Sequence, residues 1–151
     1  MGLVSGHWVW GGGWLSQLGF HDFAGSSVVH ALGGFAVLAG IKLLGARRGK
    51  FNKDGSSNTI HGHGLTLAAM GGVILWIGWF GFNAGSTLTA SDPEAIAHIM
   101  MTTNLALAAA AVTTLVIPWI KDKASVEAAM NGALSGLVGV TAGCVDVSKQ
   151  L

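Results

Sequence analysis

Residues 65–85 read LTLAAMGGVILWIGWFGFNAG and contain no Asp, Glu, Lys, Arg or His. At about 1.5 Å rise per residue, a helix of this length crosses the roughly 30 Å hydrocarbon layer of a bilayer. A run selected only for lipid would consist mainly of Leu, Ile and Val. The last third instead mixes aromatic residues with glycine, GWFGFNAGS over residues 78–86, and ends on Asn83 and Ser86. The stretch therefore predicts a membrane-spanning helix that also forms a shaped wall.

The composition supports an integral membrane protein. Charged residues make up 10% of the 151 residues and hydrophobic residues 51%, against about 25% charged in soluble domains. A net charge of +1 gives no reason to expect a nucleic-acid partner. Cys144 is the single cysteine, which excludes an internal disulfide framework and a cysteine metal site. The N-terminus lacks the basic region of a secretory signal, and residues 1–151 are one domain or part of one.

Four apolar segments have the length of spanning helices: Phe23–Leu44, Leu65–Gly85, Ala95–Ile120 and Val126–Val145. They lack the alternation of barrel strands, and open strands do not survive in lipid. Leu3–Phe20, rich in Trp and Gly, reads as the end of a helix followed by an outer loop. The expected fold is all-α, with about four transmembrane helices and a partial one.

The basic residues predict the orientation. Five of the eight lie in the Lys42–Lys53 connection and two at Lys121 and Lys123, whereas none lies between Ser86 and Ala95. By the positive-inside rule, the first two sites are cytoplasmic. Asp22 and Ser86 therefore share the outer side of a multi-pass protein in the cell membrane.

The 24 glycines have a physical use, because helices in lipid associate through small residues that allow close backbone approach. Three pairs have the four-residue spacing that places both glycines on one helix face: Gly81 with Gly85, Gly132 with Gly136, and Gly139 with Gly143. Thr102, Thr103, Asn104, Thr113 and Thr114 add interhelical hydrogen-bonding groups in the third segment.

Asp22 and His30 are the candidate functional residues of the first segment. Asp22 precedes the apolar run, where a carboxylate either caps the helix N-terminus or attracts a cation at the outer mouth. His30 is eight residues further on, about 12 Å deeper at helical rise. Ionisable groups at such depth usually face a bundle interior or a polar path, although a neutral histidine bonded to a neighbouring carbonyl is the alternative.

The remaining histidines point to no metal site. His61 and His63 lie where a cytoplasmic loop meets a helix, and no further ligand follows at metal-binding spacing. His98 begins the third segment near the outer surface. An arrangement of His30 and His98 as axial haem ligands is a weak alternative, because the two differ in expected depth.

With Trp10 in VWGGG, Asp22 and His30 in DFAGSSVVH, and the string WIGWFGFNAGS, the chain closely resembles the ammonium transporter family (Amt/Mep/Rh), most strongly its Amt branch. SGLVGVTAGC in the fourth segment also looks familial, and the resemblance extends from about His7 to Ser148. It implies part of an eleven-helix fold that forms homotrimers with one pore in each subunit. It implies no cofactor and a transport protein rather than an enzyme.

The resemblance also implies roles for individual residues. Trp10 would line an outer ammonium recruitment site by cation–π contact, and the Ser86 hydroxyl would accept a hydrogen bond there. Asp22 would stabilise this vestibule, Phe82 would be one of two phenyl gates, and Trp79 would form pore wall. His30 would be the first member of a histidine pair.

The resemblance places the second phenyl gate before residue 1 and the partner histidine after residue 151. We therefore expect residues 1–151 to be the middle part of a transporter and not to conduct alone. A P-II-type regulatory protein at the inner loops is a possible partner in this family. An ammonium-sensing module of a signalling protein is the alternative function.

Overall fold

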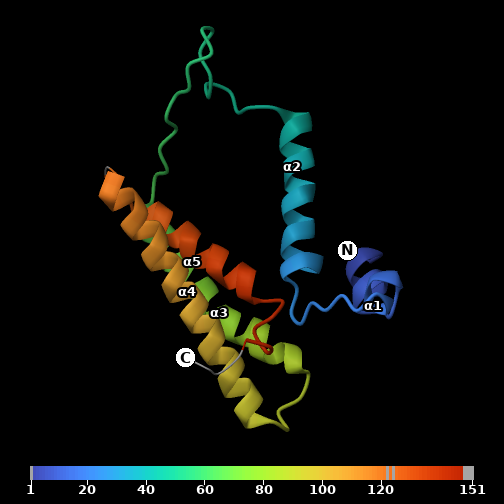
Figure 1. Ribbon diagram of the computed structural model, residues 1–151. Coiled ribbons are helices and arrows are strands. Elements are labelled where there is room, and N and C mark those ends of the chain that lie inside the picture. Colours follow the sequence, from blue (N-terminus) through green and yellow to red (C-terminus); the bar gives the residue numbers. More distant parts are fainter. Residues whose placement is uncertain (1, 122, 124, 148–151) are drawn as a thin grey trace.

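The computed structural model describes residues 2–121, 123 and 125–147, and this part of the chain is helical without a strand (Figure 1). The all-α prediction is confirmed. Its elements in chain order are the π-helical turn η1 (Val4–Val9), α1 (Trp14–Gln17), the π-helical turn η2 (Ser26–Ala31), α2 (Leu32–Leu44), α3 (Leu65–Ala84), the 3₁₀ turn η3 (Gly85–Thr87), α4 (Pro93–Lys121) and α5 (Val126–Val140).

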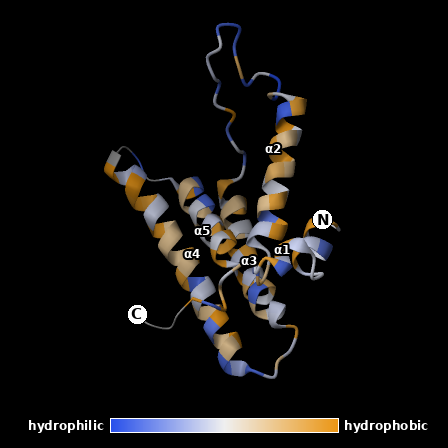
Figure 2. Ribbon diagram, turned by 45° about the vertical axis from the view of Figure 1, so that its right-hand side comes forward, coloured by the Kyte–Doolittle hydropathy of each residue, from blue (hydrophilic) through white to orange (hydrophobic). Residues whose placement is uncertain are grey.

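Three helical stretches are long and apolar enough to cross a membrane: Ser26–Leu44, Leu65–Thr87 and Pro93–Ile120. Their lengths of 19, 23 and 28 residues match the first three predicted segments. Figure 2 shows hydrophobic residues along the four long helices and strongly hydrophilic residues in the connection between α2 and α3. Most of these apolar side chains are exposed, which suits helices whose solvent is hydrocarbon.

The fourth segment differs in length from the prediction. Its helix α5 ends at Val140 and residues 141–146 form turns, so the helix spans about 22 Å at α-helical rise. The amides of Phe23 and Ala24 donate to the carbonyls of Ala142 and Thr141, and the Ala142 amide donates to Ser26 Oγ at 2.7 Å. The segment around residues 23–26 thus forms hydrogen bonds with the backbone just after α5, where the groups no longer bond within a helix.

Glycine lets α4 and α5 pack closely. A Cβ added to Gly132 would lie 2.7 Å from the carbonyl oxygen of Ala110, and one added to Gly136 would lie 2.7 Å from the Ala110 Cβ. Both distances are shorter than real Cβ contacts, so this pair acts as predicted. The members of the other two predicted pairs have nothing within 4 Å at the Cβ position, so no packing partner is seen for them: Gly81, Gly85, Gly139 and Gly143.

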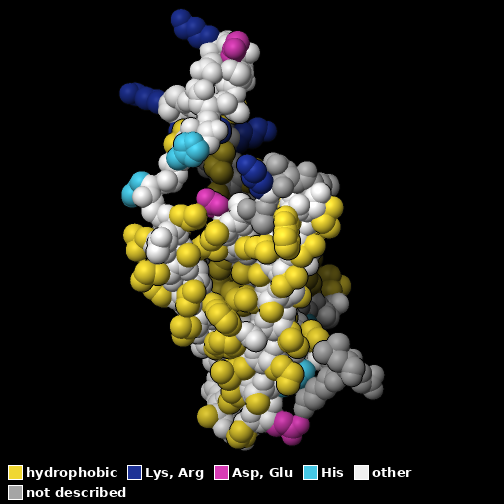
Figure 3. All heavy atoms as spheres, turned by 90° about the vertical axis from the view of Figure 1, so that its left-hand side faces the viewer, with side chains coloured by type: hydrophobic (Ala, Val, Ile, Leu, Met, Phe, Trp, Pro, Cys, Tyr) yellow, Lys and Arg dark blue, Asp and Glu magenta, His cyan; other side chains and the backbone are white. Residues whose placement is uncertain are grey.

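The helix ends agree with alternating spans. In Figure 1 the α2–α3 connection and the C-terminal end of α4 lie toward one end of the molecule, and the α3–α4 connection lies at the other. On the face in Figure 3, all Lys and Arg side chains lie at the end that carries the α2–α3 connection. Helix α2 stands apart from α3, α4 and α5 and buries none of its residues.

Candidate functional site

Asp22 organises the N-terminus of η2. Its side chain is only 2% exposed. Oδ1 accepts a hydrogen bond from the Gly25 amide at 2.7 Å, and Oδ2 accepts from the amides of Ser27 and Val28 at 2.7 and 3.0 Å. Gly25 has a φ of 118°, which favours glycine in this turn. The capping prediction is confirmed.

Trp10 is fixed against the same turn. Its Nε1 donates to the backbone carbonyl of Asp22 at 2.6 Å, and Ser5 Oγ donates to the carbonyl of Val28 at 2.9 Å. Two side-chain hydrogen bonds therefore join η1 to the η2 region. The Trp10 side chain is still 50% exposed, so the indole is held in place while part of its surface stays accessible.

His30 packs against two aromatic rings of α3. Its ring stacks on Trp79 with centroids 5.1 Å apart and an interplanar angle of 26°, and its centroid lies 5.5 Å from that of Phe82. The Nε2 atom is buried and has no hydrogen-bond partner among the described residues. An unpaired ring nitrogen against an aromatic wall is available to a ligand or to another side chain.

His30 lies nearer the helix start than the sequence predicts. The expected depth counted helical rise from Asp22, but the span begins at Ser26 because the Asp22 carboxylate caps a turn that precedes the helix. His30 is the fifth residue of this span, about 6 Å from its beginning. It also lies in a π-helical turn, a geometry frequent at functional sites.

The exit of α3 carries the other predicted residues. Trp79 Nε1 donates to Thr141 Oγ1 at 2.9 Å, and the centroids of Trp79 and Phe82 are 5.5 Å apart. Ser86 Oγ donates its proton to the carbonyl of Phe82 at 2.8 Å. Because that proton is committed, the Ser86 oxygen presents only lone pairs to any other partner.

The structure thus links the six predicted residues, which we term the outer cluster: Trp10, Asp22, His30, Trp79, Phe82 and Ser86. Trp10 contacts Asp22, Asp22 caps the turn that carries His30, and His30 contacts the α3 aromatic rings that lead to Ser86. Their functional roles remain predictions at this point.

Two supporting residues were not predicted as part of the site. Thr141 is fully buried and receives the Trp79 indole while donating to the Leu137 carbonyl at 2.6 Å. Asn83 is also fully buried; its Nδ2 donates to Thr103 Oγ1 at 3.0 Å, and its Oδ1 has no partner among the described residues. The sequence does mark both residues, because each is a polar residue within an apolar segment.

The predicted interhelical bonds of the third segment are confirmed in part. Thr103 receives Asn83, and Thr102 Oγ1 donates to the Cys144 carbonyl at 2.8 Å. Thr113 and Thr114 instead donate to carbonyls of their own helix, at Ala109 and Ala110. The hydroxyls that hydrogen-bond to a neighbouring element thus lie in the N-terminal half of α4.

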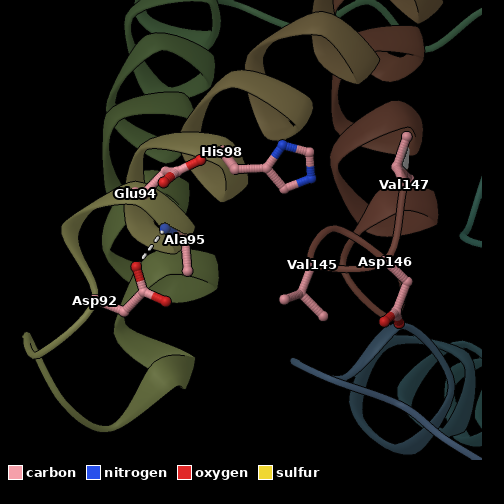
Figure 4. Close-up of a pocket in the computed structure, with 7 residues that line it drawn as sticks. All are labelled: Asp92, Glu94, Ala95, His98, Val145, Asp146 and Val147. Carbon is pink, nitrogen blue, oxygen red and sulfur yellow. Dashed lines mark hydrogen bonds between the residues drawn. The ribbon is translucent and has the colours of Figure 1, made fainter. Parts of the chain in front are cut away.

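His98 lines a cleft that is separate from the outer cluster. This cleft has a volume of about 460 Å³ and lies between the start of α4 and residues 145–147 (Figure 4). His98 projects into it, and Asp92, Glu94 and Asp146 also line it. Asp92 caps α4 by accepting from the Ala95 amide at 3.0 Å. His30 and His98 therefore occupy different surroundings, which does not favour their use as a haem-ligand pair.

His61 and His63 are exposed in the connection before α3. No group of three or more His, Cys, Asp or Glu side chains in the described ranges is arranged to hold a metal ion. The structure therefore gives no support to a metal-binding interpretation of this pair.

Residues 2–150 match the model of the Ammonium Transporter Family. This chain belongs to that family. It is 51% identical to ammonium transporter Amt2 of Archaeoglobus fulgidus, over 93% of this chain and 32% of the relative, and 46% identical to the putative ammonium transporter sll1017 of Synechocystis, over 97% and 34%. The chain thus spans about a third of the length of these relatives.

Solved structures give the same result. A structure titled Sensor Amt Protein matches with a TM-score of 0.87 and 41% identity, over 93% of this chain and 36% of that one. The N240A mutant of Candida albicans Mep2 matches with a TM-score of 0.79 and 36% identity, over 91% and 30%. The resemblance predicted from DFAGSSVVH and WIGWFGFNAGS is confirmed, and the chain is a multi-pass membrane protein of this family.

Proposed function

We propose that this chain forms part of a path that carries ammonium or ammonia across the cell membrane, and that it acts in transport rather than as an enzyme. The observation that supports this most is the outer cluster, which joins an accessible indole, a hydroxyl oxygen restricted to accepting, and an unpaired histidine nitrogen. The matched relatives are named ammonium transporters.

Ammonium suits these groups chemically. It is a compact cation with four N–H donors, so an aromatic face attracts it and a lone-pair acceptor binds it. The indole of Trp10 supplies the face, and the Ser86 oxygen supplies the acceptor. The buried charge of Asp22 raises the local cation concentration.

Inward movement requires the cation to lose water. The aromatic rings of Phe82 and Trp79 cannot replace the water molecules that surround a hydrated ion. The entry of an ion such as Na⁺ is therefore disfavoured. The Nε2 atom of His30 is an unpaired polar side-chain atom beside these rings. There it accepts a proton or a hydrogen bond from the dehydrated substrate.

The family resemblance and the distribution of basic residues supply the wider setting of the proposal. Residues 1–151 form part of a transmembrane domain in a homotrimer, the Lys42–Lys53 and Lys121–Lys123 connections face the cytoplasm, and a P-II-type protein docks at the inner loops. The similarity to the structure titled Sensor Amt Protein covers 36% of that chain and does not favour a signalling role.

A chimera tests the proposed activity. The 151 residues replace the matching third of Archaeoglobus fulgidus Amt2, and ammonium uptake is measured in cells that lack their own ammonium transporters. We expect uptake by the chimera and none by the 151 residues alone. A well-folded, membrane-inserted chimera without uptake would contradict the proposal.

Cysteine labelling in the same chimera tests the orientation. A cysteine at Thr89 should react with an impermeant thiol reagent from outside, and one at Asn52 only from inside. Cys144 is fully buried and should contribute little background. The opposite pattern would overturn the topology.

A further inference from the structure

The hydroxyl of Ser26, the first residue of η2, is inserted into the hydrogen-bond pattern at the end of α5. Its oxygen accepts a hydrogen bond from the Ala142 amide at 2.7 Å and donates to the Val138 carbonyl at 2.5 Å. Val138 and Ala142 are four residues apart, the spacing of the bond that would continue an α-helix. The serine thus takes the place of one helical hydrogen bond, and α5 ends at Val140.

The same end of α5 holds the indole of Trp79. Thr141 is fully buried, and its Oγ1 accepts from Trp79 Nε1 at 2.9 Å while donating to the Leu137 carbonyl at 2.6 Å. The carbonyl of Thr141 accepts from the Ala24 amide at 3.1 Å. The position of the indole therefore depends on where the α-helical bonding of α5 stops.

Ser26 is also tied to the other ring of the stack. It lies four residues before His30 in the same π-helical turn, and the His30 ring stacks on Trp79 with centroids 5.1 Å apart. The backbone of Ser26 thus leads directly to the histidine, while its hydroxyl sets the end of the helix that anchors the tryptophan. One side chain connects the supports of both rings.

We propose that Ser26 is a positioning residue for the stack of His30 on Trp79. Without the serine hydroxyl, the Ala142 amide bonds directly to the Val138 carbonyl, because an α-helix pairs groups at this spacing and a side chain inserted between them interrupts the helix. The direct bond brings the two backbone groups closer together and extends α5. The anchor of the indole then moves, and the indole shifts relative to the histidine.

This inference rests on the proposed function, in which Nε2 of His30 receives the dehydrated substrate. The hydrogen bonds of the Ser26 hydroxyl run to α5 and not to Trp10 or Ser86, where we propose that ammonium is recruited. Loss of the hydroxyl should therefore disturb the step after recruitment. Such a change lowers the maximal rate and leaves the concentration for half-maximal transport nearly unchanged.

Ammonium-evoked currents in proteoliposomes test the proposal, with the chimera of Archaeoglobus fulgidus Amt2 that contains all 151 residues. Ser26→Ala should lower the maximal current about fivefold and keep KM within about twofold of the parent. Ser26→Thr retains the hydroxyl and should keep most of the current. Ser27→Ala is the matched control and should resemble the parent, because the described residues show no hydrogen bond from the Ser27 hydroxyl to α5.

Fluorine NMR separates positioning from a general loss of stability. The chimera is labelled with 5-fluorotryptophan, and Trp79→Phe identifies the Trp79 signal. We expect a displaced Trp79 signal in Ser26→Ala and an unchanged one in Ser27→Ala. A merely structural role would reduce the amount of folded protein but leave the signal of the folded protein in its place.

The outcomes are distinct for the two proposals. A folded parent chimera without current would contradict the proposed function, and the fluorine signal would still decide the role of Ser26. An unmoved Trp79 signal in Ser26→Ala, with or without a loss of current, would overturn the positioning role. If Ser26→Ala does not fold, Ser26→Cys replaces it, because a thiol keeps the shape and weakens both hydrogen bonds. Ser26→Cys should then displace the Trp79 signal and lower the maximal current, and parent-like values of both would overturn the proposal.

Discussion

Two aspartates show how differently this chain builds its two ends. The Asp22 carboxylate accepts hydrogen bonds from three backbone amides and is 2% exposed. Its turn also binds Trp10 and the backbone that follows α5. Asp54 accepts the amide and hydroxyl of Ser56, two residues away, on an exposed hairpin. These bonds lower the pKa of the Asp54 carboxyl but join no separate elements. Similar local chemistry therefore supports a site in one region and a solvated loop in the other.

The largest expected effect is on uptake after removal of each carboxylate. In the chimera, Asp22→Ala should reduce ammonium uptake more than tenfold, because three buried amides lose their acceptor and the turn beneath Trp10 loses its fixed shape. Asp54→Ala should leave uptake nearly unchanged. Initial rates of ammonium uptake, compared at equal membrane expression, provide the measurement. An equal loss of uptake in the two variants would contradict the distinction between the two regions.

A second comparison concerns two glycines on α5. Gly136→Ala should destabilise the protein by about 1–3 kcal/mol, since the added methyl group overlaps Ala106 and Ala110 of α4. Gly139→Ala meets open space and should be neutral or slightly stabilising. Thermal unfolding of the detergent-solubilised chimera measures both. If Gly139→Ala is the more harmful, the close α4–α5 contact is assigned to the wrong face.

Two threonines of α4 sharpen the same contrast. Thr103→Val removes the partner of the buried Asn83 amide and should cost about 1–2 kcal/mol. Thr113 bonds the Ala109 carbonyl of its own helix and is exposed, so Thr113→Val should change stability by less than about 0.5 kcal/mol. The same thermal unfolding assay measures both variants. A larger loss of stability in Thr113→Val than in Thr103→Val would contradict the prediction.

The smallest expected effect is that of the loop histidines. His61→Ala and His63→Ala should leave uptake by the chimera within about twofold of the parent, because both side chains are exposed in the connection before α3. A severe loss in either variant would show that the connection before α3 takes part in transport.

Much of the fold was predictable, because a helix that crosses lipid requires a long run of apolar residues without charges. Leu65–Gly85 lacks charges, and the helix Leu65–Ala84 follows it almost residue by residue. The end of α5 was not predictable, because Val140 and Thr141 are followed by residues as apolar as those before them. The helix stops where Phe23 and Ala24 bind its following carbonyls, a contact between segments more than 110 residues apart.

The candidate site shows the same limit. The residues of the outer cluster were predicted from VWGGG, DFAGSSVVH and GWFGFNAGS, and the cap formed by Asp22 followed from its place before an apolar run. The π-helical turn at His30 and its place near the start of the helical stretch were missed, because both depend on the register set by Asp22. Thr141 was missed as a partner of Trp79 because its role exists only after α3 and α5 pack.

The most direct test of the central claim is the current evoked by an ammonium pulse in proteoliposomes that contain the chimera. His30→Ala and His98→Ala replace two histidines near the outer side, but only His30 stacks on Trp79 and contacts Phe82. We predict a saturable current in the parent, its loss in His30→Ala, and its retention within about twofold in His98→Ala. A current that survives in His30→Ala but disappears in His98→Ala would place the ammonium path in the cleft that His98 lines and contradict the account.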